Sequence, residues 1–362
     1  MAGTWARNRA TERIAELAEA GLADREFRRA VLDVLHEVVG FGSYVWLLTD
    51  PVSEVGSAPL ADVPCLPELP GLVKSKYATA VNRWTNLRRQ GVPARLLTTA
   101  TGGDLAASPV WRDVLSRYGI ADVASAVFAD QHGCWGFLDL WRDDAAGPFD
   151  AADAAFLADV AAPLARGLRR MQARTFIHPA TAGRSDAGSV VLTLDDDLRI
   201  IGRTAASRAW LDVLLPPQPN EQAIPASVYN VAAQLLAAEA GIDDHPAFAR
   251  IHLAEGFWLT LRAARLSSDA EQDARAAAVP TVAVTIEETS AADRLDLFGR
   301  AFGLTARERQ LLSLLATGSD TRKLARQMSV SEHTVTDHLK SIFAKTGARD
   351  RVTVLSRALG TR

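Results

Sequence analysis

The sequence predicts a multidomain protein, in which two α+β domains precede a small all-α domain of four helices. At 362 residues the chain exceeds what a single hydrophobic core usually organises. Strand-like and helix-like apolar patterns alternate up to about residue 290, and only helix-like patterns follow. Residues 176–187 are rich in Gly, Ser, Asp and Pro, as expected of a linker. We therefore expect domains at residues 1–175, 186–290 and 298–362.

The first segment combines helices and strands. It opens with apolar residues at helical spacing, namely Ile14, Leu17, Ala18, Leu22, Phe27, Val31, Leu35 and Val38. We then expect strands at 43–49, 122–129 and 134–141, and helices at 69–89, 109–118 and 151–173. Asp130-Gln131-His132-Gly133 predicts a hairpin loop, and Pro148-Phe149-Asp150 predicts the start of the last helix.

Over residues 10 to 170 this order of elements resembles the GAF family of sensory domains. The resemblance rests on Trp135-Gly136-Phe137-Leu138-Asp139-Leu140 and on the following Pro148-Phe149-Asp150-Ala151-Ala152-Asp153. It implies an α+β sensory fold that commonly encloses a ligand. We interpret the Trp side chains of this segment as core, with an aromatic ligand pocket as the alternative. They include Trp46, Trp84, Trp111, Trp135 and Trp141.

The second segment predicts a strand pair, a helical middle and trailing antiparallel strands. Strands are expected at 188–194, 198–202, 249–253, 257–266 and 281–287, with one helix containing Ala209 and Trp210 and another at 228–240. We interpret Asp195-Asp196-Asp197 as a solvated turn and Glu255-Gly256 as a hairpin turn. The arrangement resembles a PAS-type sensor fold.

Composition and motifs argue against several classes of protein. Because the chain has no run of roughly 18 apolar residues and no basic-then-apolar start, we expect no membrane segment and a cytoplasmic protein. Cys65 and Cys134 are interpreted as ordinary buried thiols, and we expect no metal and no cofactor. The chain lacks a G-x-x-x-x-G-K loop, an H-E-x-x-H helix and a G-x-S-x-G elbow, so we expect no enzyme.

Positive charge is concentrated at the C-terminus. Residues 298–362 contain 12 Lys and Arg against 5 Asp and Glu, a formal charge of +7, whereas the rest of the chain has 28 against 38 and carries −10. The whole-chain value of −3 conceals this separation. A compact basic segment beside an acidic body is expected when only one domain meets the phosphates of nucleic acid.

Four short helices are predicted in this basic segment. Thr305-Ala306-Arg307-Glu308 is a capping box for the first helix, which ends near Gly318. The others are expected at Thr321–Met328, at Glu332–Thr346 with Ser331 as its cap, and at Arg351–Leu359. In the third helix a single apolar stripe faces the core. Its residues are Val335, Leu339, Ile342 and Phe343.

The opposite face of the third helix is the candidate DNA-reading surface. Its N-terminal end carries His333, Thr334, Thr336, Asp337 and Lys340, where a helix in the major groove makes its base contacts. Asp337 is expected either to accept a hydrogen bond from cytosine or to repel misplaced phosphates. His338 is assigned to packing. Phosphate contacts are expected from the helix starts, Ser331 included, and from basic side chains, namely Arg322, Lys323, Lys340, Lys345, Arg349 and Arg351.

This segment resembles the LuxR-type helix-turn-helix family. The matching residues are Leu304-Thr305-Ala306-Arg307-Glu308, Leu324-Ala325, Val330-Ser331-Glu332-His333-Thr334-Val335, His338, Ile342, Lys345, Gly347 and Arg351. The resemblance implies a four-helix module that binds operator DNA, commonly as a dimer through its fourth helix. Two positions depart from the family pattern: Thr336 replaces a frequent phosphate-binding Lys, and Asp337 stands where small or apolar residues are common.

These features predict a DNA-binding transcriptional regulator. A small-molecule ligand or a partner protein is expected to act on the first two domains and, through the short joining stretch at 287–303, to alter the binding of double-stranded DNA by a homodimer. RNA polymerase is a further candidate partner. The alternative is a ligand-free dimerisation scaffold that carries a constitutive DNA-binding module.

Overall fold

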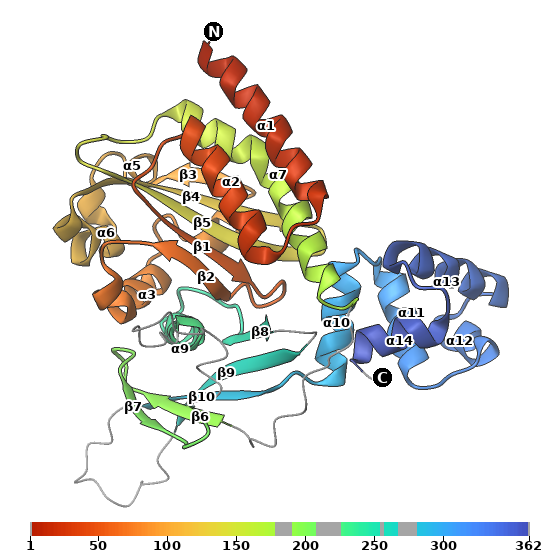
Figure 1. Ribbon diagram of the computed structural model, residues 1–362. Coiled ribbons are helices and arrows are strands. Elements are labelled where there is room, and N and C mark those ends of the chain that lie inside the picture. The colour runs from red at the N-terminus through yellow and green to blue at the C-terminus, as the bar shows by residue number, and fades with distance from the viewer. Residues whose placement is uncertain (1, 178–189, 208–225, 254–256, 267–280, 361–362) are drawn as a thin grey trace, which may run out of the picture.

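Two antiparallel five-stranded sheets form the body of the protein, and the C-terminal helices lie at one side of it (Figure 1). The computed structural model describes residues 2–177, 190–207, 226–253, 257–266 and 281–360. Most of the predicted linker, the predicted helix residues Ala209 and Trp210, and the predicted turn Glu255-Gly256 lie outside the described residues. We term residues 2–177 the first unit, and the described residues between 190 and 288 the second unit.

The first sheet has the strand order β2-β1-β5-β4-β3. Its strands are β1 (Ser43–Thr49), β2 (Gly56–Asp62), β3 (Ala94–Leu96), β4 (Ile120–Asp130) and β5 (Gly133–Asp143). The three predicted strands are confirmed as β1, β4 and β5, whereas the sequence does not predict β2 and β3. At the β4–β5 turn a Cβ on Gly133 would lie 2.4 Å from Pro51, so this close approach requires glycine.

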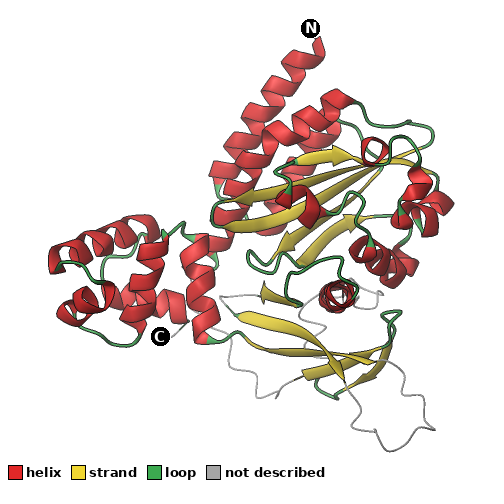
Figure 2. Cartoon of the chain, turned by 180° about the vertical axis from the view of Figure 1, so that it is seen from behind, coloured by secondary structure: helices red, strands yellow, loops and turns green. Residues whose placement is uncertain are grey.

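Helices cover both faces of the first sheet (Figures 1 and 2). One face packs against α1 (Ala2–Ala20), α2 (Asp24–Val38) and α7 (Ala151–Arg174), and the other against α3 (Leu69–Ala78), α4 (Trp84–Arg89), α5 (Leu97–Ala100) and α6 (Pro109–Asp113). Because side chains alternate along a strand, Trp46 of β1 lies in the core shared with α1, α2 and α7, and Leu47 lies in the core shared with α4 on the other face. The predicted start of α7 is confirmed, because Asp150 and Asp153 form a capping box there.

Two helices predicted in the first unit are interrupted, which corrects the sequence interpretation. The stretch at 69–89 divides into α3 and α4, because Thr79 is extended and Asn82 has a left-handed φ of 50°. The stretch at 109–118 divides into α6 and a 3₁₀ turn at Leu115–Tyr118, because Val114 leaves the helical region. Helical periodicity alone does not report such breaks.

The second sheet has the order β7-β6-β10-β9-β8. It comprises β6 (Val190–Leu194), β7 (Ile200–Arg203), β8 (Phe248–His252), β9 (Trp258–Leu266) and β10 (Thr281–Glu288), and α9 (Ala226–Glu239) packs on it. Figure 2 shows α9 end-on between the two sheets. Asp195 accepts hydrogen bonds from the amides of Asp197 and Arg199, which confirms the predicted turn.

Two buried ion pairs join the units. Arg83 Nη2 of the first unit lies 2.7 Å from Asp243 Oδ2 of the second, and Arg250 Nε lies 2.6 Å from Asp50 Oδ2. All four side chains are almost fully buried. Because a buried charge without its partner is costly, both pairs bind the units into a fixed arrangement.

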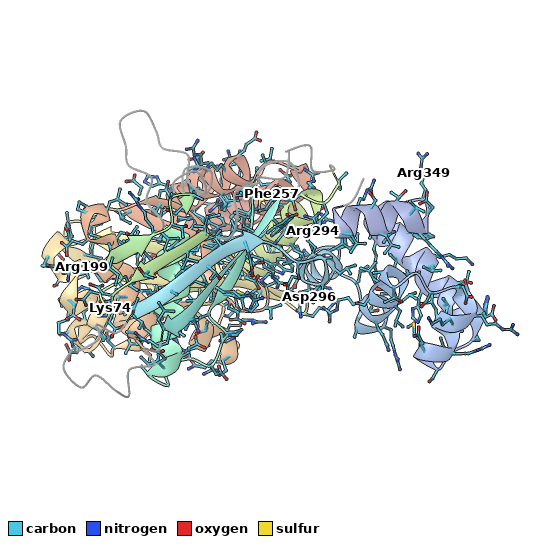
Figure 3. The ribbon with its side chains drawn as sticks, turned by 90° about the horizontal axis from the view of Figure 1, so that it is seen from below. Lys74, Arg199, Phe257, Arg294, Asp296 and Arg349 are labelled. Atoms are coloured by element: carbon cyan, nitrogen blue, oxygen red, sulfur yellow. The ribbon has the colours of Figure 1, made fainter. Side chains whose placement is uncertain are left out.

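Helix α10 (Ala291–Ala301) connects the body to the C-terminal helices (Figure 1). The predicted joining stretch at 287–303 is therefore mostly helical, and the predicted domain start at 298 falls inside this helix. Phe298 of α10 packs edge-on against Phe176, whose ring stacks on Trp258 of the second unit. On the other side Arg294, labelled in Figure 3, donates hydrogen bonds to main-chain carbonyls near the C-terminus of the chain. α10 thus contacts both units and the C-terminal helices.

Candidate nucleic-acid interface

Local caps define the four C-terminal helices, α11 (Ala306–Ala316), α12 (Thr321–Met328), α13 (Glu332–Thr346) and α14 (Arg351–Leu359). The predicted bounds of the last three are confirmed. The Thr305 hydroxyl accepts from the Glu308 amide, and the Glu308 carboxylate accepts from the Thr305 amide, so the predicted capping box is present. The Ser331 hydroxyl caps α13 by accepting from the Thr334 amide.

The turn between α12 and α13 fixes the angle of the two helices. Ser329 ends α12 in the left-handed conformation, with φ 57°, and Ser331 starts α13 two residues later. The inner faces of the two helices share one core, formed by Leu324, Ala325, Met328, Val335, Leu339 and Ile342. The predicted apolar stripe of α13 is therefore confirmed, and the opposite face of this helix is left exposed.

The exposed N-terminal half of α13 carries the predicted base-contacting side chains. His333 and Lys340 are 83% and 70% exposed. Asp337 lies between them, with a carboxylate oxygen 3.4 Å from His333 Nε2 and another 3.5 Å from Lys340 Nζ. Thr336 is exposed and donates its hydroxyl proton to the Glu332 carbonyl. Exposed pairs of this kind are weak, so these side chains are available to an incoming ligand.

The predicted basic residues divide into two groups. Arg322, Lys323, Lys340 and Arg349 are exposed, and Figure 3 shows Arg349 at the upper edge of the C-terminal helices. Arg351 is half-buried and donates to the Thr321 hydroxyl over 2.8 Å. Lys345 Nζ lies 2.7 Å from Glu308 Oε2. The last two cations therefore hold helices together in this structure.

Two features of this surface were not predicted from the sequence. Arg326 is exposed on α12, one helical turn after Arg322 and Lys323, and its spacing could have indicated it. The second feature is the buried carboxylate of Glu308, which also accepts from the Ser341 hydroxyl at 2.6 Å. Burial alone would raise the pKa of Glu308, but the hydrogen bonds from Lys345 and Ser341 lower it to about 2. Glu308 therefore anchors α13 to α11 as a carboxylate.

Within the described residues, other classes of site have little support. No helix there is long and apolar enough to cross a membrane. One group of neighbouring side chains, Asp243, Asp244 and His245, has oxygen and nitrogen atoms close enough to hold a metal ion. However, Asp243 already accepts hydrogen bonds from Arg83 and Thr85, so protein cations and donors occupy its carboxylate.

Comparisons with known proteins match part of this chain. Residues 303–358 match the family described as bacterial regulatory proteins, luxR family. The chain is 41% identical over 54 residues to a monoamine regulon transcriptional regulator of Klebsiella aerogenes, and these residues are 15% of this chain and 24% of that protein. It is 32% identical over 63 residues to the transcriptional regulatory protein DesR of Bacillus subtilis, covering 17% of this chain and 32% of DesR.

A third relative is the probable HTH-type transcriptional regulator GfsR of Streptomyces halstedii, 34% identical over 85 residues, which are 21% of this chain and 35% of GfsR. The chain thus matches only about a quarter to a third of the length of these regulators. The printed names of all three describe regulators of transcription, the third as a probable one. The C-terminal helices of this chain form a LuxR-type DNA-binding domain.

Proposed function

We propose that the protein is a transcriptional regulator that reads double-stranded DNA with α12 and α13. The observation that carries the proposal is the exposed polar half of α13, held on a buried core and surrounded by exposed cations. A helix with this arrangement fits the major groove with its N-terminal residues against base edges. The net charge of +7 over residues 298–362, from 12 basic and 5 acidic side chains, favours approach to phosphates.

Each predicted site residue has a role in this proposal. His333, Thr334, Thr336 and Asp337 contact base edges, with Asp337 released from its two weak pairs. Phosphates are bound by exposed cations and by the start of α13, namely Arg322, Lys323, Ser331, Lys340 and Arg349. Lys345 and Arg351 act mainly by holding helices in place, through Glu308 and Thr321.

Fluorescence anisotropy of a labelled duplex, selected from random sequences with the full chain, tests this proposal. Lys340→Ala should weaken binding on every duplex and reduce the slope of log affinity against log salt by about 1, because roughly one counterion fewer is released. Asp337→Ala should instead change the preferred sequence. The matched control is Lys74→Ala, which removes an exposed Lys from the body. Failure of the wild-type chain to bind any duplex at low salt would reject the proposal.

We further propose that residues 1–175 form a GAF-like and residues 186–290 a PAS-like sensory domain, which respond to a small molecule or a partner protein. The shared strand order of the two sheets, their helical covers and an internal cavity support this. The scaffold alternative predicts that no small molecule changes duplex affinity. Anisotropy titrations with candidate ligands distinguish the two.

Homodimerisation through α14 is the remaining part of the proposal. Val352 on this helix is 77% exposed, the highest value for a large apolar side chain among the described residues, and it suits a self-contact. Val352→Glu should shift the dimer to monomer in sedimentation at micromolar concentration and weaken binding to a duplex with two half-sites. An unchanged sedimentation coefficient would exclude α14 as the dimer contact.

A further inference from the structure

A cavity of about 210 Å³ lies inside the first unit, between the first sheet and helices α3 and α6. Its walls are mainly aliphatic and aromatic, with Leu47, Leu72, Val110 and Trp141 among them. Leu66 also lines it and is 46% exposed, so this residue marks a rim open to solvent. Since an apolar cavity of about 150 Å³ accepts benzene, this one suits a molecule of roughly ten non-hydrogen atoms.

Charged groups in the cavity wall neutralise each other. Lys76 Nζ lies 2.8 Å from Asp139 Oδ2, and both side chains are at least 90% buried. The other oxygen of Asp139 accepts from the Trp84 indole at 2.8 Å and from the Ser125 hydroxyl at 2.6 Å. Because this carboxylate and this ammonium are satisfied within the wall, an additional charge in the cavity would have no counterion. A neutral molecule therefore fits the site best.

Among the described residues, two buried polar atoms of side chains that line the cavity have no hydrogen-bond partner. They are Asn82 Oδ1, an acceptor, and Trp141 Nε1, a donor. Both residues line the cavity and are at least 95% buried. An unpaired buried polar atom is unfavourable, so the pair of atoms points to a molecule that supplies one donor and one acceptor.

The second unit completes the wall of this cavity. Ala226 and Asn230, both on α9, line it, and both are buried. The Asn230 side chain also donates to the Gly56 carbonyl of β2 over 2.9 Å. A molecule in the cavity would therefore touch both units and not the first unit alone.

We propose that this cavity binds a neutral, mostly apolar small molecule with one hydrogen-bond donor for Asn82 and one acceptor for Trp141, enclosed in part by α9. This inference rests on the proposed regulatory function and specifies the ligand class and the unit that closes over it. Occupancy would favour the arrangement in which α9 stays against the first unit, and α10 joins that arrangement to the DNA-binding helices.

Isothermal titration calorimetry of the full chain with 2-quinolone, a neutral bicyclic lactam, tests the inference. We expect saturable binding of one 2-quinolone molecule per chain. Naphthalene, which lacks both polar groups, should bind at least tenfold more weakly. The 2-naphthoate anion should also bind at least tenfold more weakly. Trp141→Phe should weaken 2-quinolone binding about tenfold, because each lost hydrogen bond is worth on the order of that factor. The matched control is Trp46→Phe, since Trp46 Nε1 is also buried and has no hydrogen-bond partner in the described part of the chain, but this side chain lies on the other side of the sheet.

A second pair of variants tests the contribution of α9. Ala226→Leu should fill part of the cavity from the second unit and lower 2-quinolone affinity at least tenfold. Ala238→Leu, on the same helix but outside the cavity, should leave it unchanged. Absence of saturable 2-quinolone binding, or equal affinities in Trp141→Phe and Trp46→Phe, would overturn the inference. Duplex anisotropy on the same samples separates this failure from failure of the regulator proposal, which would appear as lost DNA binding with calorimetry intact.

Discussion

The two sheets of the body share one strand order but differ in how their cores are closed. Helices pack on both faces of the first sheet. The core of the second sheet, as far as it is described, is formed with α9 and with side chains of the first unit, namely Val55, Val73 and Tyr77. The same connectivity thus yields one sheet with helices of its own unit on both faces and one sheet whose core includes side chains of the neighbouring unit. Strand order alone does not indicate which unit can fold independently.

This difference has a functional consequence under the proposed mechanism. Because α9 belongs to the core of the second unit and also lines the cavity of the first, a change at the cavity reaches the second sheet directly. The contacts between the units range from buried ion pairs to an exposed one. Removing them one at a time measures how far the second unit depends on the first.

The largest effect is expected from Arg83→Met. This change removes the closest guanidinium from the fully buried Asp243 carboxylate, at a cost of about 3 kcal/mol or more in the free energy of unfolding. Urea titration followed by tryptophan fluorescence measures it. Arg89→Met, at the end of α4, removes an exposed pair with Asp244 and a longer approach of 3.9 Å to Asp243, and should cost less than about 1 kcal/mol. Equal losses in both variants would contradict the dependence of the second unit on this pair.

Local signals made the C-terminal helices predictable from sequence. The caps at Thr305, Ser331 and Asp350 act within four residues, so the helix bounds follow from short segments. The exposed face of α13 followed from the helical period in the same way.

Features that depend on distant residues were not predictable in this way. Strand β2 contains Gly56 and Pro59, which are poor strand formers, and it exists because it pairs with β1. The pairing of Lys345 with Glu308 and of Lys76 with Asp139 also joins positions far apart in the chain. Sequence patterns name these residues as charged but do not show which partner each one meets.

Acid should lower the free energy of unfolding by weakening the contact between the units. This loss should be smaller than the loss caused by Arg83→Met. Burial alone would raise the pKa of Asp243, but hydrogen bonds from His245 and Thr85 and the charge of Arg83 hold it well below its ordinary value of 3.8. The stabilisation is complete above pH 3.8 and is lost as the pH falls below it towards the folded-state pKa. Urea midpoints between pH 5 and pH 3 should therefore fall more steeply in the wild-type chain than in Asp243→Asn. Parallel curves would show that Asp243 is not coupled to folding.

A smaller loss, about 1 to 2 kcal/mol, is expected from Asn230→Ala, which removes the buried hydrogen bond to the Gly56 carbonyl. The same urea titration measures this loss. As the control, Asn86→Ala removes an exposed hydrogen bond within the first unit and should change stability by less than about 0.5 kcal/mol. If the two variants were equally stable, α9 would not depend on β2 for its position.

The smallest effect is expected from Lys74→Ala. Lys74 Nζ lies 2.7 Å from Asp197 Oδ1 in the β6–β7 turn, so this pair also joins the units, but its side chains are 39% and 58% exposed. Figure 3 labels Lys74 and the neighbouring Arg199 at this edge of the body. An exposed pair contributes about 0.5 kcal/mol or less, and salt at about 1 M screens it further. Urea midpoints of Lys74→Ala and the wild-type chain should therefore nearly coincide at low salt and merge at high salt. If Lys74→Ala lost more stability than Asn230→Ala, the exposed pair would contribute more to the contact between the units than its buried centre does.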